Sequence, residues 1–257
     1  MEKNFSYENA LHFAKIANLA YQEEQDFKKT ASAMGYKKIK YFDVDGAQAY
    51  GMCNKDCMVL AFRGTEPNQW NDIKADLNAW PVRNELGCGR IHSGFKREVD
   101  DIWKKIETWL SKQKFEQAYT CGHSLGGAMS TIACSRLPEG TVCYSFGSPR
   151  VGSPGWVKEF NKKFTLHRFV NNNDVVPRVP FAFMWYRHAG KLYYINTYGN
   201  IRGSSWWQRL KDRFRGYKYA FKKRQWFDSI YDHAMHKYIK RIKNFRYYDD
   251  EMNKGYV

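Results

Sequence analysis

The chain has 257 residues, and its 42 lysines and arginines exceed its 26 aspartates and glutamates by 16. Hydrophobic residues make up 43% of the chain and charged residues 26%, values near the globular average that exclude wholesale disorder. No stretch approaches the roughly eighteen uncharged apolar residues of a membrane-spanning helix, so we expect a globular protein with ample chain to bury a core.

The predicted elements alternate between helices and strands along most of the chain. Residues 6–21 and a stretch ending near Gly35 predict helices, and 38–44, 48–52 and 58–62 predict strands. The remaining predicted elements are a helix at 94–113, a strand at 117–121, a helix at 124–136, a strand at 142–146, a helix at 154–162, strands at 166–170 and 191–196, and a last helix with Ile230, Ala234, Tyr238, Ile242 and Phe245 on its buried face. This alternation predicts a mostly parallel sheet with helices on both faces, in a single domain over residues 1–257.

The excess positive charge is concentrated near the C-terminus. Residues 201–246 carry 14 basic and three acidic side chains, and the segment 199–227 combines them with apolar residues at helical spacing. These apolar residues form one stripe of a predicted helix: Trp207, Leu210, Phe214, Tyr217 and Phe221. The pattern favours a helix packed on the core with a basic outer face, and it also fits a helix lying on an anionic membrane surface. Nucleic-acid binding is a third interpretation, but no recognised motif supports specific binding.

A glycine-rich turn around Ser124 carries the strongest chemical signal. Gly122, His123, Ser124, Leu125 and Gly126 fit the G-x-S-x-G pattern, and the flanking residues predict a strand before the turn and a helix after it. Small neighbours allow a serine at such a sharp turn to expose its hydroxyl beside the N-terminus of the following helix. The alternative is an ordinary glycine-rich turn that starts a helix. We favour Ser124 as a nucleophile.

A nucleophilic serine needs a histidine to accept its proton and an acid to orient that histidine. On strand–turn–helix elbows of this kind the order along the chain is serine, acid, histidine. Between Ser124 and residue 200 the acids are Glu139, Glu159 and Asp174. Glu139 and Glu159 lie within or beside predicted helices, whereas Asp174 follows a predicted strand, where parallel-sheet enzymes place such groups. We therefore favour Asp174, although a simple turn after three asparagines also fits that position.

Four histidines follow Ser124, at positions 167, 188, 233 and 236. His167 lies within a predicted strand and His188 begins another, positions that are more typical of structural histidines. His233 is near the start of the last predicted helix, and His236 is about one turn further along. Because a residue at a loop-to-helix junction reaches a serine at the sheet edge more easily, we favour His233 as the base and keep His236 as the alternative.

Eight segments, in order along the chain as far as Tyr238, resemble the class 3 lipases, the fungal-lipase-like group of α/β-hydrolases. They are VLAFRGT (59–65), DIKADL (72–77), IHSGF (91–95), TCGHSLGGA (120–128), FGSPRVG (146–152), NNNDVVPRVP (171–180), HAGKLYYIN (188–196) and DHAMHKY (232–238). The resemblance implies an α/β-hydrolase fold, with Ser124 as nucleophile, Asp174 as orienting acid and His233 as general base. It is weakest at 199–227, where the basic stripe has no clear counterpart.

The resemblance also implies an oxyanion hole. The RGT segment corresponds to Thr65, and the backbone N–H of Leu125 would be its partner. Fixed N–H donors of this kind stabilise the charge that develops on an ester oxygen during attack. The alternative is that Thr65 only ends a strand.

The segment 66–86 resembles the lid of the same family. Trp70, Ile73, Leu77 and Trp80 recur at helical spacing, so one face of a predicted helix is strongly apolar. Such a helix could cover an apolar pocket in water and turn over onto lipid. The alternative is a fixed surface helix packed by the same residues.

The sequence predicts no cofactor and no metal. Cys53 and Cys57 are spaced C-x3-C, but no second ligand pair with zinc-like spacing follows, and no phosphate-binding or dinucleotide motif is present. Lys15 interrupts the apolar residues near the N-terminus, so no signal peptide is predicted, and six cysteines do not form a disulfide scaffold. We expect a protein of the cytoplasm, or one bound peripherally to an intracellular membrane.

The predicted function is that of a lipase or esterase that hydrolyses carboxylic esters of acylglycerols or phospholipids through an acyl-enzyme. Its activity would be triacylglycerol lipase-like or phospholipase A1-like, and a lipid ester would be its partner. No protein partner can be inferred. The alternative is a catalytically silent lipid- or membrane-binding protein that retains the fold.

Overall fold

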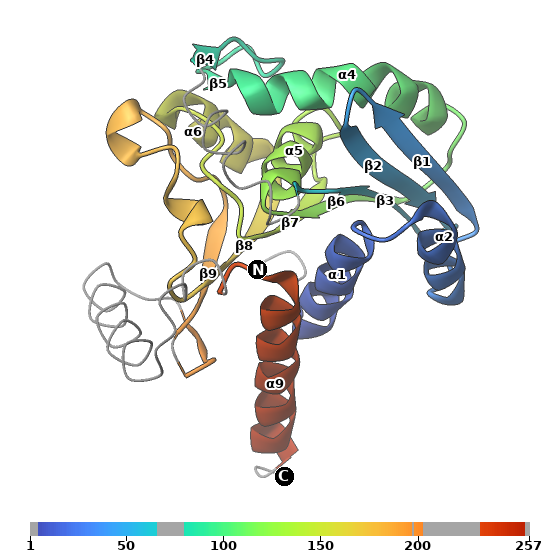
Figure 1. The fold of residues 1–257 in the computed structure, drawn as a ribbon, viewed down its shortest axis with the longest axis vertical. Coiled ribbons are helices and arrows are strands. Elements are labelled where there is room, and N and C mark those ends of the chain that lie inside the picture. The colour runs from blue at the N-terminus through green and yellow to red at the C-terminus, as the bar shows by residue number, and fades with distance from the viewer. Residues whose placement is uncertain (1–4, 66–79, 197, 203–231, 255–257) are drawn as a thin grey trace.

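The computed structural model describes residues 5–65, 80–196, 198–202 and 232–254. Its described strands form an eight-stranded sheet in the order β1-β2-β3-β6-β7-β8-β9-β10 (Figure 1). The strands are β1 (Lys38–Val44), β2 (Ala47–Cys53), β3 (Cys57–Phe62), β6 (Gln117–His123), β7 (Val142–Phe146), β8 (Thr165–Asn171), β9 (Lys191–Ile195) and β10 (Ile201–Arg202). Neighbouring strands from β3 to β9 run parallel, and the pairs at the two edges of the sheet run antiparallel.

Helices cover both faces of this sheet, as the sequence predicts. The helices α1 (Tyr7–Leu19), α2 (Glu24–Ala33) and α9 (Met235–Lys254) are on one side, and α4 (Ser93–Leu110), α5 (Leu125–Cys134) and α6 (Pro154–Lys163) are on the other (Figure 1). Two separate clusters of buried apolar side chains fill the space between each helix layer and the sheet. The central strands are buried on both faces for this reason, and every residue of β7 is buried.

The helix α4 shows how local sequence produces this packing. Phe95, Val99, Ile102 and Ile106 follow steps of four, three and four residues, and all four are almost completely buried. At 3.6 residues per turn these steps place the four side chains on one face, which packs on the sheet and on α5. The lysines and acids between them remain on the outer face.

The structure adds elements that the sequence does not predict and corrects one placement. A two-stranded sheet joins β4 (Pro81–Val82) to β5 (Ile91–His92), and short 3₁₀ helices occupy Val176–Arg178 and Ala182–Met184. His188 does not begin a strand, because β9 starts only at Lys191; instead, its Nε2 lies 2.7 Å from the carbonyl oxygen of Pro177. The last helix begins at Met235, so His233 lies in the turn before it.

Two predicted features fall largely outside the described residues. These are the lid residues Trp70, Ile73 and Leu77, and the basic stripe from Trp207 to Phe221. Trp80, the fourth lid candidate, is 83% exposed and lies just before β4. Of the helices that the structure describes, none is both long enough and apolar enough to cross a bilayer.

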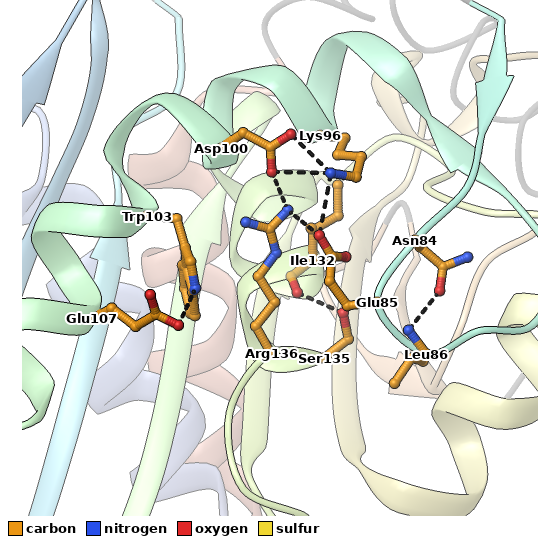
Figure 2. Close-up of polar contacts among 10 residues, drawn as sticks. All are labelled: Asn84, Glu85, Leu86, Lys96, Asp100, Trp103, Glu107, Ile132, Ser135 and Arg136. Atoms are coloured by element: carbon orange, nitrogen blue, oxygen red, sulfur yellow. Dashed lines mark hydrogen bonds and ion pairs between the residues drawn. The ribbon is translucent and has the colours of Figure 1, made fainter.

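An ion-pair network ties the loop after β4 to the helix layer (Figure 2). The Arg136 side chain, only 5% exposed at the end of α5, pairs with Glu85 at 2.9 Å and also with Asp100 of α4. Lys96 pairs with the same two carboxylates, at 3.2 and 2.8 Å. The Arg136 guanidinium also lies over the Trp103 ring, 5.1 Å from its centroid. The network therefore joins the loop, α4 and α5 through one nearly buried cation.

We expect Arg136→Met to lower the free energy of unfolding by about 1–3 kcal/mol, because it leaves two carboxylates facing each other with one cation fewer. Urea denaturation followed by circular dichroism measures the effect. Lys162→Met is the matched control, since Lys162 is 60% exposed in its pair with Glu159, and its loss should change stability by less than about 1 kcal/mol. Equal effects of the two substitutions would contradict this role of Arg136.

Candidate active site

Ser124 lies at the sharp turn between β6 and α5, as the sequence predicts. Its backbone has φ 57° and ψ −129°, a conformation that residues with a side chain rarely adopt. Such strain costs about 1–3 kcal/mol and is found mainly at functional sites. The backbone N–H of Ser124 donates to the carbonyl oxygen of Phe146, at the end of β7, which fixes the turn against the neighbouring strand.

The two glycines of the G-x-S-x-G pattern are required by close packing around this turn. A Cβ atom at Gly122 would lie 2.1 Å from the carbonyl oxygen of Gly126, and one at Gly126 would lie 2.3 Å from the carbonyl oxygen of Phe62. Any larger residue would push α5 away from β6 or from β3. The glycines thus allow α5 to begin directly behind Ser124.

Asp174 and His233 meet although 59 positions separate them in the sequence. The Asp174 Oδ2 atom lies 2.9 Å from His233 Nδ1, and both side chains are buried. Asp174 follows β8 and His233 precedes α9, so the acid and the histidine come from two loops. With Nδ1 bonded to the acid, Nε2 is the ring atom left to exchange a proton with a substrate or nucleophile.

The structure distinguishes the histidine candidates by their surroundings. His236 is exposed on the first turn of α9, and His167 is buried within β8, where its Nδ1 lies 3.2 Å from the Tyr193 hydroxyl. His233 is the histidine beside Asp174. Ser124 Oγ is buried and makes no hydrogen bond to any described residue. Hydrogen bonds of catalytic serines are often long without substrate and shorten in the complex.

Thr65 and Leu125 lie on either side of the same turn. Phe62 of β3 pairs with Gly122 of β6, and a Cβ atom at Gly64 would lie 3.3 Å from Ser124 Cβ, so the segment that leads to Thr65 runs beside the turn. Leu125 is the first residue of α5, and the N–H groups of a first helical turn have no acceptor within the helix. An anion between these segments could therefore receive hydrogen bonds from both.

Tyr238 is a site residue that the sequence analysis treats only as part of a buried helix face. Its O–H donates to Asp174 Oδ2 at 2.5 Å, and its oxygen accepts the N–H of Asn171 at 3.1 Å. The N–H of Val176 donates to Asp174 Oδ1 at 2.9 Å. Burial, together with the adjacent Asp174 carboxylate, raises the pKa of Tyr238 well above its usual range, so the tyrosine remains a donor. The Asp174 carboxylate is thereby fixed on both oxygens.

We expect Tyr238→Phe to lower kcat by about 10- to 100-fold with little change in KM. A hydrogen bond to a charged group is worth about 1.5–3 kcal/mol, and each 1.36 kcal/mol added to the activation free energy slows the reaction about tenfold. Steady-state kinetics on a soluble ester measure the effect. Tyr36→Phe is the control: it also removes a buried tyrosine hydroxyl, one that lies 2.9 Å from His12 Nε2. An unchanged kcat in Tyr238→Phe would show that Asp174 does not need this donor.

His123, next to Ser124, connects the turn to the backbone of His233. Its Nε2 lies 2.7 Å from the His233 carbonyl oxygen, and its Nδ1 lies 2.9 Å from the Tyr21 hydroxyl. Burial, with His233 close by, lowers the pKa of His123 well below its usual range, so its ring is neutral. Because a carbonyl only accepts, Nε2 carries the proton and Nδ1 accepts from Tyr21. The signal that could have pointed to this role is the place of His123 inside the G-x-S-x-G pattern.

The described residues contain no group of three or more His, Cys, Asp or Glu side chains that could bind a metal ion. All six cysteines are free, and Cys53 and Cys57 lie on the neighbouring strands β2 and β3. The groups around the turn at Ser124 are a buried histidine, a buried carboxylate and backbone donors.

Comparison with known proteins shows what this chain is similar to. The sequence model of the family described as Lipase (class 3) matches residues 59–184. Toxin TseL of Vibrio cholerae is 27% identical over 206 residues, which cover 63% of this chain and 31% of the toxin. Secreted mono- and diacylglycerol lipase A of Penicillium cyclopium is 29% identical over 168 residues, which cover 58% of this chain and 51% of that protein.

Solved structures show the same fold. One is a triacylglycerol lipase whose catalytic centre is described as a serine protease triad. The two structures superimpose with a TM-score of 0.61 at 22% sequence identity, and the match covers 73% of this chain and 80% of the lipase chain. The fold is thus the α/β-hydrolase fold. The chain spans about a third of the toxin and about half of the fungal lipase in length. With a family model that matches residues 59–184, similar relatives and the shared fold, the chain is similar to the class 3 lipase family.

Proposed function

We propose that this protein hydrolyses carboxylic esters of lipids, with Ser124, His233 and Asp174 as its catalytic triad. The observation that carries the proposal is the 2.9 Å contact between Asp174 and His233, beside a serine in a strained turn at a helix N-terminus. An isolated glycine-rich turn would not need a buried carboxylate and histidine next to it. The names of the related lipases, and the serine protease triad described for the triacylglycerol lipase of the same fold, support this assignment.

The proposed reaction has two steps. In the first, Ser124 Oγ attacks the ester carbonyl carbon while His233 Nε2 accepts the serine proton, and the N–H groups of Thr65 and Leu125 donate to the oxyanion. His233 then donates that proton to the leaving alcohol as the ester C–O bond breaks, leaving an acyl-enzyme. In the second step, a water molecule transfers a proton to His233 and attacks the acyl carbon. His233 then returns that proton to Ser124 Oγ as the acyl C–Oγ bond breaks, which releases the carboxylic acid and restores Ser124.

The arrangement around the acid supports this cycle. Three donors, from His233, Tyr238 and Val176, surround the Asp174 carboxylate and offset the cost of burying its charge. A carboxylate placed in this way stabilises the positive charge that His233 carries between the two proton transfers. His123 donates to the His233 carbonyl and so restrains the loop on which the base lies.

We further propose acylglycerols or phospholipids as substrates. The names of the related mono- and diacylglycerol lipases support the acylglycerols. The test is fatty-acid release from dioleoylglycerol, trioleoylglycerol and phosphatidylcholine in mixed micelles, with a short-chain p-nitrophenyl ester as a soluble substrate. Acid released from an acylglycerol supports a lipase, and acid released from the sn-1 position of phosphatidylcholine alone supports a phospholipase A1. No turnover of any of the four esters would favour the catalytically silent lipid-binding alternative.

The place of action that we propose is the cytoplasm, or the surface of an intracellular membrane. All six cysteines are free thiols, which a reducing compartment favours. Fractionation of cells that express the tagged chain tests this proposal, and recovery of the protein from the medium with oxidised thiols would overturn it.

A further inference from the structure

Four of the five large apolar side chains that are exposed among the described residues lie near the two ends of one row of extended backbone. In this row, Val82 of β4 pairs with Ile91 of β5, Ile91 bridges to Gly152, and Gly152 bridges to Arg187. The four side chains, which we call the aromatic edge, are Trp80, Phe181, Phe183 and Trp185, with exposed fractions of 83, 54, 80 and 73%. Figure 1 shows the loop before β9 extending outward on the side of the molecule where β4 and β5 lie.

Hydrogen bonds fix the loop that carries three of these side chains. The Arg187 guanidinium donates to the carbonyl oxygens of Ala182 and Tyr186, at 2.6 and 3.0 Å. The Arg150 guanidinium donates to the carbonyl oxygen of Pro180 at 2.8 Å, and the Trp185 N–H closes the turn onto Ala182 at 3.2 Å. The exposure of the aromatic side chains is thus a property of a bonded turn, and not of a loose loop.

The aromatic rings project from this turn together. Phe181 and Phe183 stack with their centroids 5.4 Å apart and their planes at 9°. Ala182 between them is also exposed, so the consecutive residues FAFMW present an almost entirely apolar tip to solvent. A soluble protein rarely exposes contiguous apolar surface of this kind unless it meets an apolar partner.

Basic residues flank the tip along the chain. From Val175 to Arg202 the sequence contains four basic residues and no acidic one. The guanidinium groups of Arg178 and Arg187 donate to carbonyl oxygens, which leave the charge of both side chains intact. Lys191, at the start of β9, is exposed as well.

We propose that the aromatic edge docks the protein on an anionic phospholipid bilayer. Tryptophan and phenylalanine side chains enter the interface between the headgroups and the acyl chains, and arginine and lysine beside them pair with lipid phosphates. An uncharged apolar groove on another protein would match the rings but not the charges around them. A bilayer with anionic headgroups matches both.

Docking through this edge would place against the lipid a loop that leads directly from the active site. The tip continues the loop that begins at Asp174, and Arg150 ties it to the segment that starts at Gly147. A Cβ atom at Gly147 would lie 2.8 Å from Asp174 Oδ2 and 3.0 Å from the His233 ring, so this segment lies directly against the catalytic side chains. This step rests on the proposed function, whereas binding to the bilayer does not.

The test compares vesicle binding by the full chain with and without the tip. The protein carries Ser124→Ala, so that no lipid is hydrolysed, and vesicles contain phosphatidylcholine alone or with phosphatidylglycerol. We expect binding to the anionic vesicles, and we expect Phe181→Ser, Phe183→Ser and Trp185→Ser together to weaken it at least about 100-fold, since each aromatic side chain contributes about tenfold. Tyr198→Ser is the matched control, because Tyr198 is 72% exposed but follows β9, whereas the tip precedes that strand.

Each outcome decides the proposal. Binding that is lost in the triple variant and kept in Tyr198→Ser supports it, whereas equal binding by all variants would assign the membrane to another surface and overturn it. Absence of binding by the parent chain also overturns it. If the parent chain dimerises in sedimentation and the triple variant does not, the partner is a second copy and not a bilayer.

Two further measurements keep folding and catalysis separate from docking. In the wild-type background the triple variant should hydrolyse the soluble p-nitrophenyl ester like the parent chain, so a failure of the proposed hydrolysis leaves the binding result unaffected. In the unaltered tip, bilayers of brominated lipid should quench Trp185 fluorescence, and Trp185→Phe should lose that quenched component. Quenching that is identical in the parent chain and in Trp185→Phe would overturn the insertion.

Discussion

Replacing Ser124 with alanine is expected to lower kcat on a soluble ester by about 10⁵- to 10⁶-fold, the loss seen when a triad nucleophile is removed. The reason is that the acyl-enzyme cannot form without the serine oxygen, which leaves only binding and the oxyanion donors to assist a direct attack by water. KM should change little, because the methyl group of alanine fits the space of the serine side chain. Steady-state kinetics with a p-nitrophenyl ester measure both constants.

Ser130→Ala is the matched control for this substitution. Ser130 is also buried, on the helix that Ser124 precedes, and its hydroxyl donates to the Gly127 carbonyl oxygen at 2.9 Å. We expect it to cost about 1 kcal/mol of stability with kcat nearly unchanged. Activity of Ser124→Ala within about tenfold of the wild type would contradict a covalent mechanism at this residue.

Replacing His233 with alanine is expected to lower kcat by about the same factor of 10⁵ to 10⁶. Without the base the serine hydroxyl keeps its proton, so losing the base costs about as much in kcat as losing the nucleophile. The double variant with Ser124→Ala should be no slower than either single variant, since the two residues act as one unit. Asp174→Asn should lower kcat by about 10⁴-fold, because the amide orients the wrong tautomer of the imidazole.

His236→Ala tests the alternative base. His236 is exposed on the first turn of α9 and is only three residues from His233, so the substitution is matched in type and place. We expect kcat within about twofold of the wild type, as for a surface change that leaves the triad intact. A loss of turnover in His236→Ala together with an active His233→Ala would reverse the assignment of the base.

Local sequence signals were sufficient to predict most of the fold. The predicted strands at 38–44 and 142–146 match β1 and β7 in full, and the helix at 94–113 overlaps α4 closely. The helix α4 is long and periodic, and glycines lie on either side of β1 and of β7, so tertiary contacts had little to override. The last helix begins at Met235, later than its apolar pattern suggests, and His233 lies before it in contact with Asp174.

The parts that could not be predicted depend on contacts between distant residues. β4 and β5 have two residues each, too few for a sequence pattern, and they exist because they pair with each other. The hydroxyl of Tyr21 meets His123 across 102 positions, and that of Tyr238 meets Asp174 across 64. Helix periodicity predicts Tyr238 as a packing residue and gives Tyr21 no role beyond ending the first predicted helix, and only the folded arrangement gives both tyrosines their hydrogen-bond partners.

The most direct test of the central claim is labelling with a fluorophosphonate probe, followed by peptide mass mapping, on the wild type and on Ser124→Ala. Such a probe reacts with a serine only when a base activates it and an oxyanion hole stabilises the adduct. We predict one covalent adduct on Ser124 in the wild type and none in the variant, with vesicles or detergent present in both samples. An unlabelled wild-type chain, or a label on a different residue, would contradict the account.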